Sequence, residues 1–198
     1  MISPTRVIAE LRIANQLRTA AARAGSEGEG DWHIGLIQRL VTTYPNCRYL
    51  EVGVRHATCW NRVAPLARFA EGVDIDPGVL EHVTAGHETV HILASDAYFR
   101  DVAGDKRFEV IFLDGDHNFA QVDKDFTNAL PHLAPDGTIV LHDTWPGSVE
   151  ETGELACGTV YQLAERLERD PQFNALTMRR FPGVTLVQRA RTDRFEDA

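Results

Sequence analysis

The chain has 198 residues, of which 43 % are hydrophobic and 25 % charged, and its formal charge at pH 7 is −9. This length suits one domain with a buried core, and the composition is that of a globular protein. An acidic charge without any basic stripe argues against nucleic acid as a partner. No apolar stretch approaches the roughly 20 residues that span a membrane, and residues 1–10 hold no apolar signal-peptide segment. We therefore expect a cytoplasmic protein without a membrane partner.

The sequence divides into two predicted parts. Residues 1–45 are predicted to form an N-terminal helical extension, and residues 46–198 the main domain. Apolar residues at helical spacing predict one helix over 4–23 and another over 32–44, with Asp31 as the N-cap of the second.

From residue 48 onward, short apolar runs alternate with amphipathic segments. The predicted strands cover residues 49–53, 70–75, 89–93, 110–113, 138–141 and 185–187. The predicted helices cover residues 58–68, 77–84, 97–102, 119–133 and 158–169. This order predicts an α/β fold, a Rossmann-like doubly wound sheet of about seven strands that is mostly parallel with helices on both faces. A Pro-Gly turn at 182–183, between β-rich runs over 173–178 and 184–188, predicts an antiparallel C-terminal hairpin.

Carboxylates follow five successive predicted strands. They are Glu51, Asp74, Asp96, Asp114 and Asp143. In open α/β sheets, ligands bind at the carboxyl ends of the strands. The five acids therefore indicate a site for a positively charged ligand.

The first turn of the sheet indicates a nucleoside. Gly53 allows a sharp turn, and Asp74 lies 21 residues later, where an acid can accept both hydroxyls of a ribose. A GxGxxG motif is missing, and Glu51 would place negative charge near a pyrophosphate, so a cationic ligand such as S-adenosylmethionine fits better than NAD. A nicotinamide-dependent oxidoreductase on a related sheet stays open as the alternative, as does a cofactor-binding domain without catalytic activity.

Three segments resemble the class I S-adenosylmethionine-dependent methyltransferases. They are FLDGDHNF (112–119), LAPDGTIVLHD (133–143) and FPGVTLV (181–187). The resemblance is strongest to the small-molecule group with a DGDH motif (methyltransferase 24-like) and covers residues 48–189. In that family the first motif is usually richer in glycine than the loop of this chain, Gly53-Val54-Arg55-His56-Ala57.

The resemblance implies S-adenosylmethionine as cofactor and assigns residues to it. The implied cofactor-binding residues are Glu51, Gly53, Val54, Asp74, Ile75, Asp96, Ala97 and Asp114. Of these, Asp74 would hold the ribose, Asp96 with the Ala97 amide the adenine edge, and Asp114 the methionine amino group or the reaction centre. The alternatives are structural, with Asp74 and Asp96 as helix caps and Glu51 as a satisfied buried acid.

The implied catalytic residues are His117, Asp114 and Asp143. His117 is a candidate general base because an unperturbed imidazole titrates near neutral pH. Some O-methyltransferases of this fold instead bind Mg²⁺ or another divalent cation through a carboxylate after strand four and an Asp-Asn or Asp-Asp pair after strand five. The matching residues are Asp114 and Asp143 as metal ligands, with Thr144 in the third place. His142 is expected to point away by strand alternation, and Asp116 to be an unpaired surface carboxylate rather than a further metal ligand.

The acceptor is predicted to be a small molecule methylated on a hydroxyl. Trp145 opens a polar loop over 146–158 and could stack on an acceptor ring or serve as a packing anchor. In the related family an N-terminal extension often covers the acceptor or forms a homodimer contact, and Trp32 and His33 are expected to lie outside the core fold in this role. Trp60 is expected in the core, as are Cys47, Cys59 and Cys157.

Overall fold

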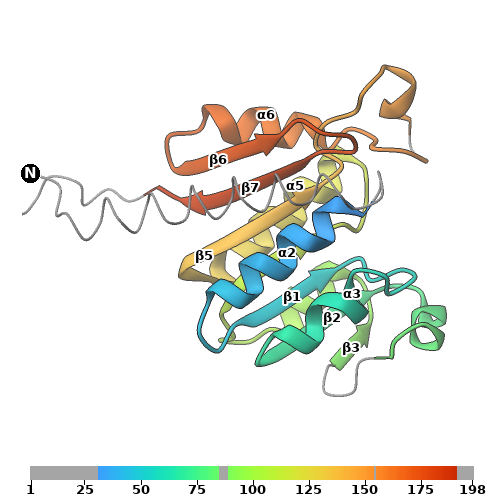
Figure 1. Cartoon of the computed structure of the whole chain (residues 1–198), viewed down its shortest axis with the longest axis vertical. Helices are drawn as coiled ribbons and strands as arrows, with labels where there is room; N and C mark the ends of the chain where they lie inside the picture. The colour runs from blue at the N-terminus through green and yellow to red at the C-terminus, as the bar shows by residue number, and fades with distance from the viewer. Residues whose placement is uncertain (1–30, 85–88, 154, 191–198) are drawn as a thin grey trace, which may run out of the picture.

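A single seven-stranded sheet, in the order β3-β2-β1-β4-β5-β7-β6, organises the protein (Figure 1). The computed structural model describes residues 31–84, 89–153 and 155–190. The strands are β1 (Arg48–Val52), β2 (Phe69–Asp74), β3 (Thr89–Ile92), β4 (Phe108–Leu113), β5 (Leu133–His142), β6 (Phe173–Met178) and β7 (Val184–Arg189). Strands β1 to β5 are parallel, whereas β7 is antiparallel to both β5 and β6. The predicted Rossmann-like fold and its C-terminal hairpin are confirmed.

Helices connect the strands in the predicted places, although several are shorter than expected. They are α2 (Trp32–Thr43), α3 (Trp60–Val63), α4 (Ser95–Ala97), α5 (Phe119–Ala129) and α6 (Tyr161–Arg169). The predicted helix over 77–84 is a 3₁₀ turn, Pro77–Glu81, which Asp76 caps by accepting a hydrogen bond from the Gly78 amide. Asp31 is the N-cap residue of α2, as predicted, but its side chain makes no capping hydrogen bond; instead its Oδ2 atom lies 3.7 Å from Nη1 of Arg62.

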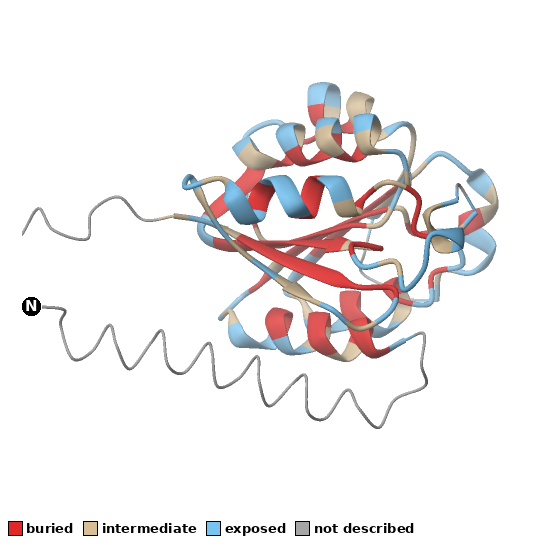
Figure 2. Ribbon diagram, turned by 90° about the horizontal axis from the view of Figure 1, so that it is seen from above, coloured by how far each residue is buried: buried red, intermediate tan, exposed pale blue. Residues whose placement is uncertain are grey.

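Two hydrophobic clusters lie on the two faces of the sheet. One joins α2 and α3 to the sheet, and the other joins α5 and α6 to the opposite face. Figure 2 shows the buried strands between these two layers of helices. As expected, Trp60 and the three cysteines are buried.

The helix α2 belongs to the first of these clusters. Trp32 and His33 are buried, and the indole Nε1 of Trp32 donates to the backbone carbonyl of Phe181 at 3.0 Å. The expectation that these two residues lie outside the core fold is therefore wrong, because the apolar face of α2 packs on the sheet. The domain boundary at residue 45 stays a prediction, and the helix predicted over 4–23 lies outside the described residues.

Tight turns shape the carboxyl edge of the sheet. Gly53 has a φ of 91°, and a Cβ added there would lie 2.1 Å from the carbonyl oxygen of Asp114. Only glycine fits this close approach of the loops that follow β1 and β4. None of the helices among the described residues combines the length and the hydropathy of a membrane-spanning segment.

Candidate active site

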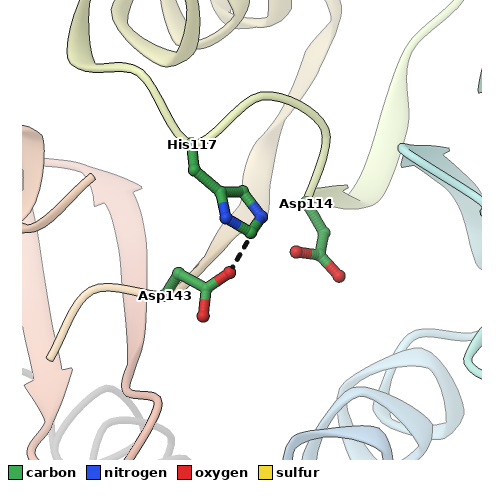
Figure 3. Close-up of side chains that lie close together, drawn as sticks. All are labelled: Asp114, His117 and Asp143. Carbon is green, nitrogen blue, oxygen red and sulfur yellow. Dashed lines mark ion pairs between the residues drawn. The ribbon is translucent and has the colours of Figure 1, made fainter. Parts of the chain in front are cut away.

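Two carboxylates and an imidazole meet where β4 and β5 end. Asp114 and His117 come from the loop after β4, and Asp143 follows β5 directly (Figure 3). The Nε2 atom of His117 lies 3.1 Å from Oδ2 of Asp143, and one ligand atom from each of the three residues falls within 4.8 Å of the others. The structure therefore brings together the three residues predicted to be catalytic.

The loop after β5 holds the imidazole of His117 from its other side. The Nδ1 atom of His117 bonds to the backbone carbonyl of Ala156, and the backbone carbonyl of His117 accepts from the Thr159 amide at 2.8 Å. Gly158 has a φ of 57°, and a Cβ there would lie 2.2 Å from the carbonyl oxygen of His117. A carbonyl oxygen can only accept, so the contact with Ala156 places a hydrogen on Nδ1.

A second histidine, His142, lies against the same carboxylates. Its Nδ1 atom is 3.1 Å from Oδ1 of Asp114 and 3.2 Å from Oδ2 of Asp143. The hydrogen directions do not satisfy hydrogen-bond geometry, so the contact is an ion pair. Its ring centroid lies 4.3 Å from that of His33 of α2. Burial alone would lower the pKa of His142, but the charge of Asp114 and the neighbouring Asp143 raise it to about 10.

The expectation that His142 points away from the site is wrong. Strand alternation separates Leu141 and His142 onto opposite faces, but it does not extend to Asp143, whose φ is 57°. This left-handed residue turns the chain so that the Asp143 carboxylate reaches His142 and His117. Burial would raise the pKa of Asp143, but these two histidines outweigh burial and hold the pKa below its usual value.

Asp74 connects the turns after β1 and β2. Its Oδ2 atom accepts from the backbone amide of Arg55 at 2.7 Å, and its Oδ1 atom from the amide of Asp76 at 2.9 Å. Each carboxylate oxygen keeps a further lone pair for a ligand. Ile75, which follows it, is 75 % exposed. The ribose role of Asp74 stays a prediction.

Glu51 is buried and internally bonded. The Tyr49 hydroxyl donates to Oε2 of Glu51 at 2.6 Å, and burial raises the pKa of Glu51 to about 8. The side chain of Val54 is also buried, so this residue can offer a ligand only its backbone. The predicted cofactor contacts of both residues are untested.

Asp96 lies inside the first turn of α4, whose N-cap is Ala94, so its alternative assignment as the cap is wrong. Its Oδ1 atom accepts from Nδ2 of Asn128 at 3.0 Å, and its Oδ2 atom bonds to Nζ of Lys124. Neither partner was predicted from the sequence. The predicted contact of Asp96 and the Ala97 amide with adenine stays a prediction.

The donor set at the ends of β4 and β5 fits a divalent cation. Asp114 and Asp143 offer carboxylate oxygens, and His117 offers an imidazole nitrogen within the same 4.8 Å. Thr144, the expected third ligand, is buried; its hydroxyl has no hydrogen-bond partner among the described residues.

The loop after β5 leads from the three-residue cluster to the surface. Trp145 is 38 % exposed, and the guanidinium of Arg179 lies 4.8 Å from its ring centroid. Together with Tyr161 these residues line a cleft of about 290 Å³. Stacking of Trp145 on an acceptor stays a prediction. Asp116 differs from the expectation, because its carboxylate accepts from the Asn118 amide at 2.7 Å.

Part of this chain matches a known protein family. The profile of a family described as a methyltransferase domain matches residues 36–144, which is more than half of the chain. A search of curated proteins found no match. The family match does not favour the oxidoreductase alternative.

Solved structures with the same fold include several methyltransferases. The O-methyltransferase TomG from Streptomyces achromogenes, in complex with SAM, is 18 % identical with a TM-score of 0.67, covering 89 % of this chain and 90 % of that one. An O-methyltransferase from Bacillus cereus, in complex with SAH, is 13 % identical with a TM-score of 0.68 and covers 89 % and 90 %. The methyltransferase MycE, in complex with Mg, SAH and mycinamycin VI, is 21 % identical with a TM-score of 0.62 and covers 90 % and 54 %.

Proposed function

Because the chain belongs to the methyltransferase domain family, we propose that it methylates a hydroxyl group of a small-molecule acceptor with S-adenosylmethionine. The observation that carries this proposal is the cluster of Asp114, His117 and Asp143 at the carboxyl edge of the sheet. A hydroxyl must lose a proton as it takes the methyl group, and this cluster supplies a base and carboxylates at one place. The names of the two O-methyltransferases with the same fold support the choice of oxygen as acceptor atom.

The turns after β1, β2 and β3 would hold the cofactor. Gly53 lets the first turn pack closely against the loop after β4, Asp74 offers carboxylate lone pairs to ribose hydroxyls, and Asp96 offers them to the nucleobase. When bound, S-adenosylmethionine supplies an activated methyl group on a sulfonium. The protein then has to orient the acceptor in line and remove its proton.

In the first route, His117 takes this proton. Since Nδ1 is bound to the carbonyl of Ala156, the nitrogen that can accept the proton is Nε2, which faces the site. Asp143, 3.1 Å from Nε2, would stabilise the imidazolium that forms. The protein's part is to hold one tautomer and one ring orientation.

In the second route, Asp114, Asp143 and His117 would hold a divalent cation such as Mg²⁺. The cation would lower the pKa of the acceptor hydroxyl and orient it. MycE, which shares the fold, contains Mg in its complex. The two routes use His117 differently, as a base in one and as a ligand in the other.

The test is methyl transfer from labelled S-adenosylmethionine to phenols, sugars and hydroxy acids, each paired with an analogue that carries an amine in place of the hydroxyl. Activity that resists a chelator and is lost in His117→Ala supports the base route. Activity that a chelator abolishes and Mg²⁺ restores supports the metal route. Cofactor binding without transfer to any acceptor would favour a silent domain, and binding of NADH alone would overturn the proposal.

A further inference from the structure

A row of polar side chains lies on α5 beside its buried apolar face. Gln121, Lys124, Asp125 and Asn128 are spaced three, four and seven residues from the first, so they share one face of the helix. All four bond to the first two residues of α4, Ser95 and Asp96, either directly or through one another. This polar face therefore serves the short turn that is predicted to contact the nucleobase.

The first set of bonds fixes Ser95. Its hydroxyl donates to Oδ1 of Asp125 at 2.6 Å, and Nε2 of Gln121 donates to the same oxygen at 3.0 Å. Asp125 is only 3 % exposed, and burial raises its pKa while these two hydrogen bonds oppose the rise. A buried and internally bonded carboxylate anchors the turn to the helix.

The second set of bonds fixes Asp96. Asn128 donates to Oδ1 at 3.0 Å and Lys124 bonds to Oδ2, so each oxygen has one partner on α5. A carboxylate can accept about four hydrogen bonds, which leaves lone pairs free. The side chain of Asp96 is 30 % exposed, so the free lone pairs remain accessible to a ligand.

We propose that Lys124 and Asn128 are positioning residues for nucleobase recognition, which fix the Asp96 carboxylate so that it accepts from the 6-amino group of adenine and rejects a 6-oxopurine. The inference rests on the proposed use of S-adenosylmethionine. A carboxylate only accepts hydrogen bonds, so it pairs with an amino group and repels a carbonyl oxygen. A freely rotating carboxylate could turn away from the wrong base, whereas one held at both oxygens cannot.

The test compares two cofactor products that differ at this one position. Isothermal titration measures the affinity for S-adenosylhomocysteine and for S-inosylhomocysteine, which carries a 6-oxo group. The wild type should prefer the adenine compound about 10- to 100-fold, the range expected for hydrogen bonds to a charged group. In the Lys124→Met/Asn128→Leu double variant this preference should fall below about threefold, through weaker binding of the adenine compound.

The melting temperature of the variants shows whether Lys124 and Asn128 position Asp96 or instead stabilise the fold. Lys124 is 56 % exposed, so its ion pair contributes little to stability, and the melting temperature should hardly change. Thr127→Ala is the matched control, because among the described residues the partner of the Thr127 hydroxyl is a carbonyl of its own helix, that of Asp123. The single variant Lys124→Met provides a second measurement if the double variant folds poorly.

A substitution of Asp96 itself gives the sharpest outcome. Asp96→Asn offers an amide that can donate to a 6-oxo group, so its preference should move toward S-inosylhomocysteine. An unchanged preference in the double variant, or an equal loss for both ligands, would overturn the inference. A wild type that binds both ligands equally would overturn it and leave the proposed function standing. A wild type that binds neither would instead contradict the proposed function.

Discussion

The two halves of the carboxyl edge hold their carboxylates in different ways. On the side of β1 and β2, Asp74 accepts from two backbone amides of adjacent turns. On the side of β4 and β5, Asp114 and Asp143 contact the imidazoles of His117 and His142, and a distant loop carbonyl holds His117. The first half is suited to binding the cofactor, which is the same whatever the acceptor. The second half is suited to accepting a proton or binding a cation. Substitutions in the two halves should therefore affect binding and turnover separately.

The largest effect is expected at the glycine that joins the halves. In Gly53→Ala, the new Cβ would lie 2.1 Å from the Asp114 carbonyl, and the residue would keep a φ of 91°. We expect a loss of more than about 3 kcal/mol in the free energy of unfolding, together with loss of cofactor binding. Urea unfolding and titration with S-adenosylhomocysteine measure both. Gly104→Ala is the control, because its φ is 54° but no atom of the described residues lies within 4 Å of the added Cβ, and it should cost only about 1–2 kcal/mol. Equal losses in the two variants would contradict the close approach of the two loops.

The next effect should be confined to the β4–β5 half. Gly158→Ala would place a Cβ 2.2 Å from the carbonyl of His117 and displace that residue. Turnover should fall about 100-fold, because a misplaced group loses its alignment with the acceptor. The affinity for S-adenosylhomocysteine should remain close to that of the wild type. Parallel loss of affinity would show that the two halves are not separable.

The converse is expected on the β1–β2 side. Asp74→Ala should weaken binding of S-adenosylhomocysteine about 10- to 100-fold, by removing hydrogen bonds to a charged group. Asp76→Ala is the control, because it removes a neighbouring exposed carboxylate whose partner within the described part of the chain is a backbone group, the Gly78 amide. Isothermal titration makes the comparison, and unchanged binding in Asp74→Ala would remove this residue from the site.

The same contrast explains what could be predicted from sequence. The strands and the hairpin could be predicted from local apolar patterns. The position of Asp74 at the end of the second strand could be predicted from its spacing after Gly53. The position of His142 could not be predicted, because it depends on the left-handed residue Asp143 and on a ring from α2. The spacing of Lys124 and Asn128, four residues apart on one helix face, can be read from the sequence. Their shared partner Asp96 cannot, because the contact requires α5 to lie beside α4.

The last effect concerns the stability of the fold alone and comes from Glu51, which is buried beneath the first turn. Its folded pKa of about 8 exceeds the ordinary 4.5, so the folded protein keeps this proton at a pH where the unfolded chain loses it. This contribution to stability is complete below the unfolded pKa and is lost as the pH rises toward the folded pKa. Glu51→Gln cannot titrate and retains an acceptor for the Tyr49 hydroxyl. Its stability relative to the wild type should rise between about pH 5 and pH 8, on the order of 1 kcal/mol or more. Urea unfolding at both values measures this difference; a difference independent of pH would show that Glu51 is ionised in the folded protein.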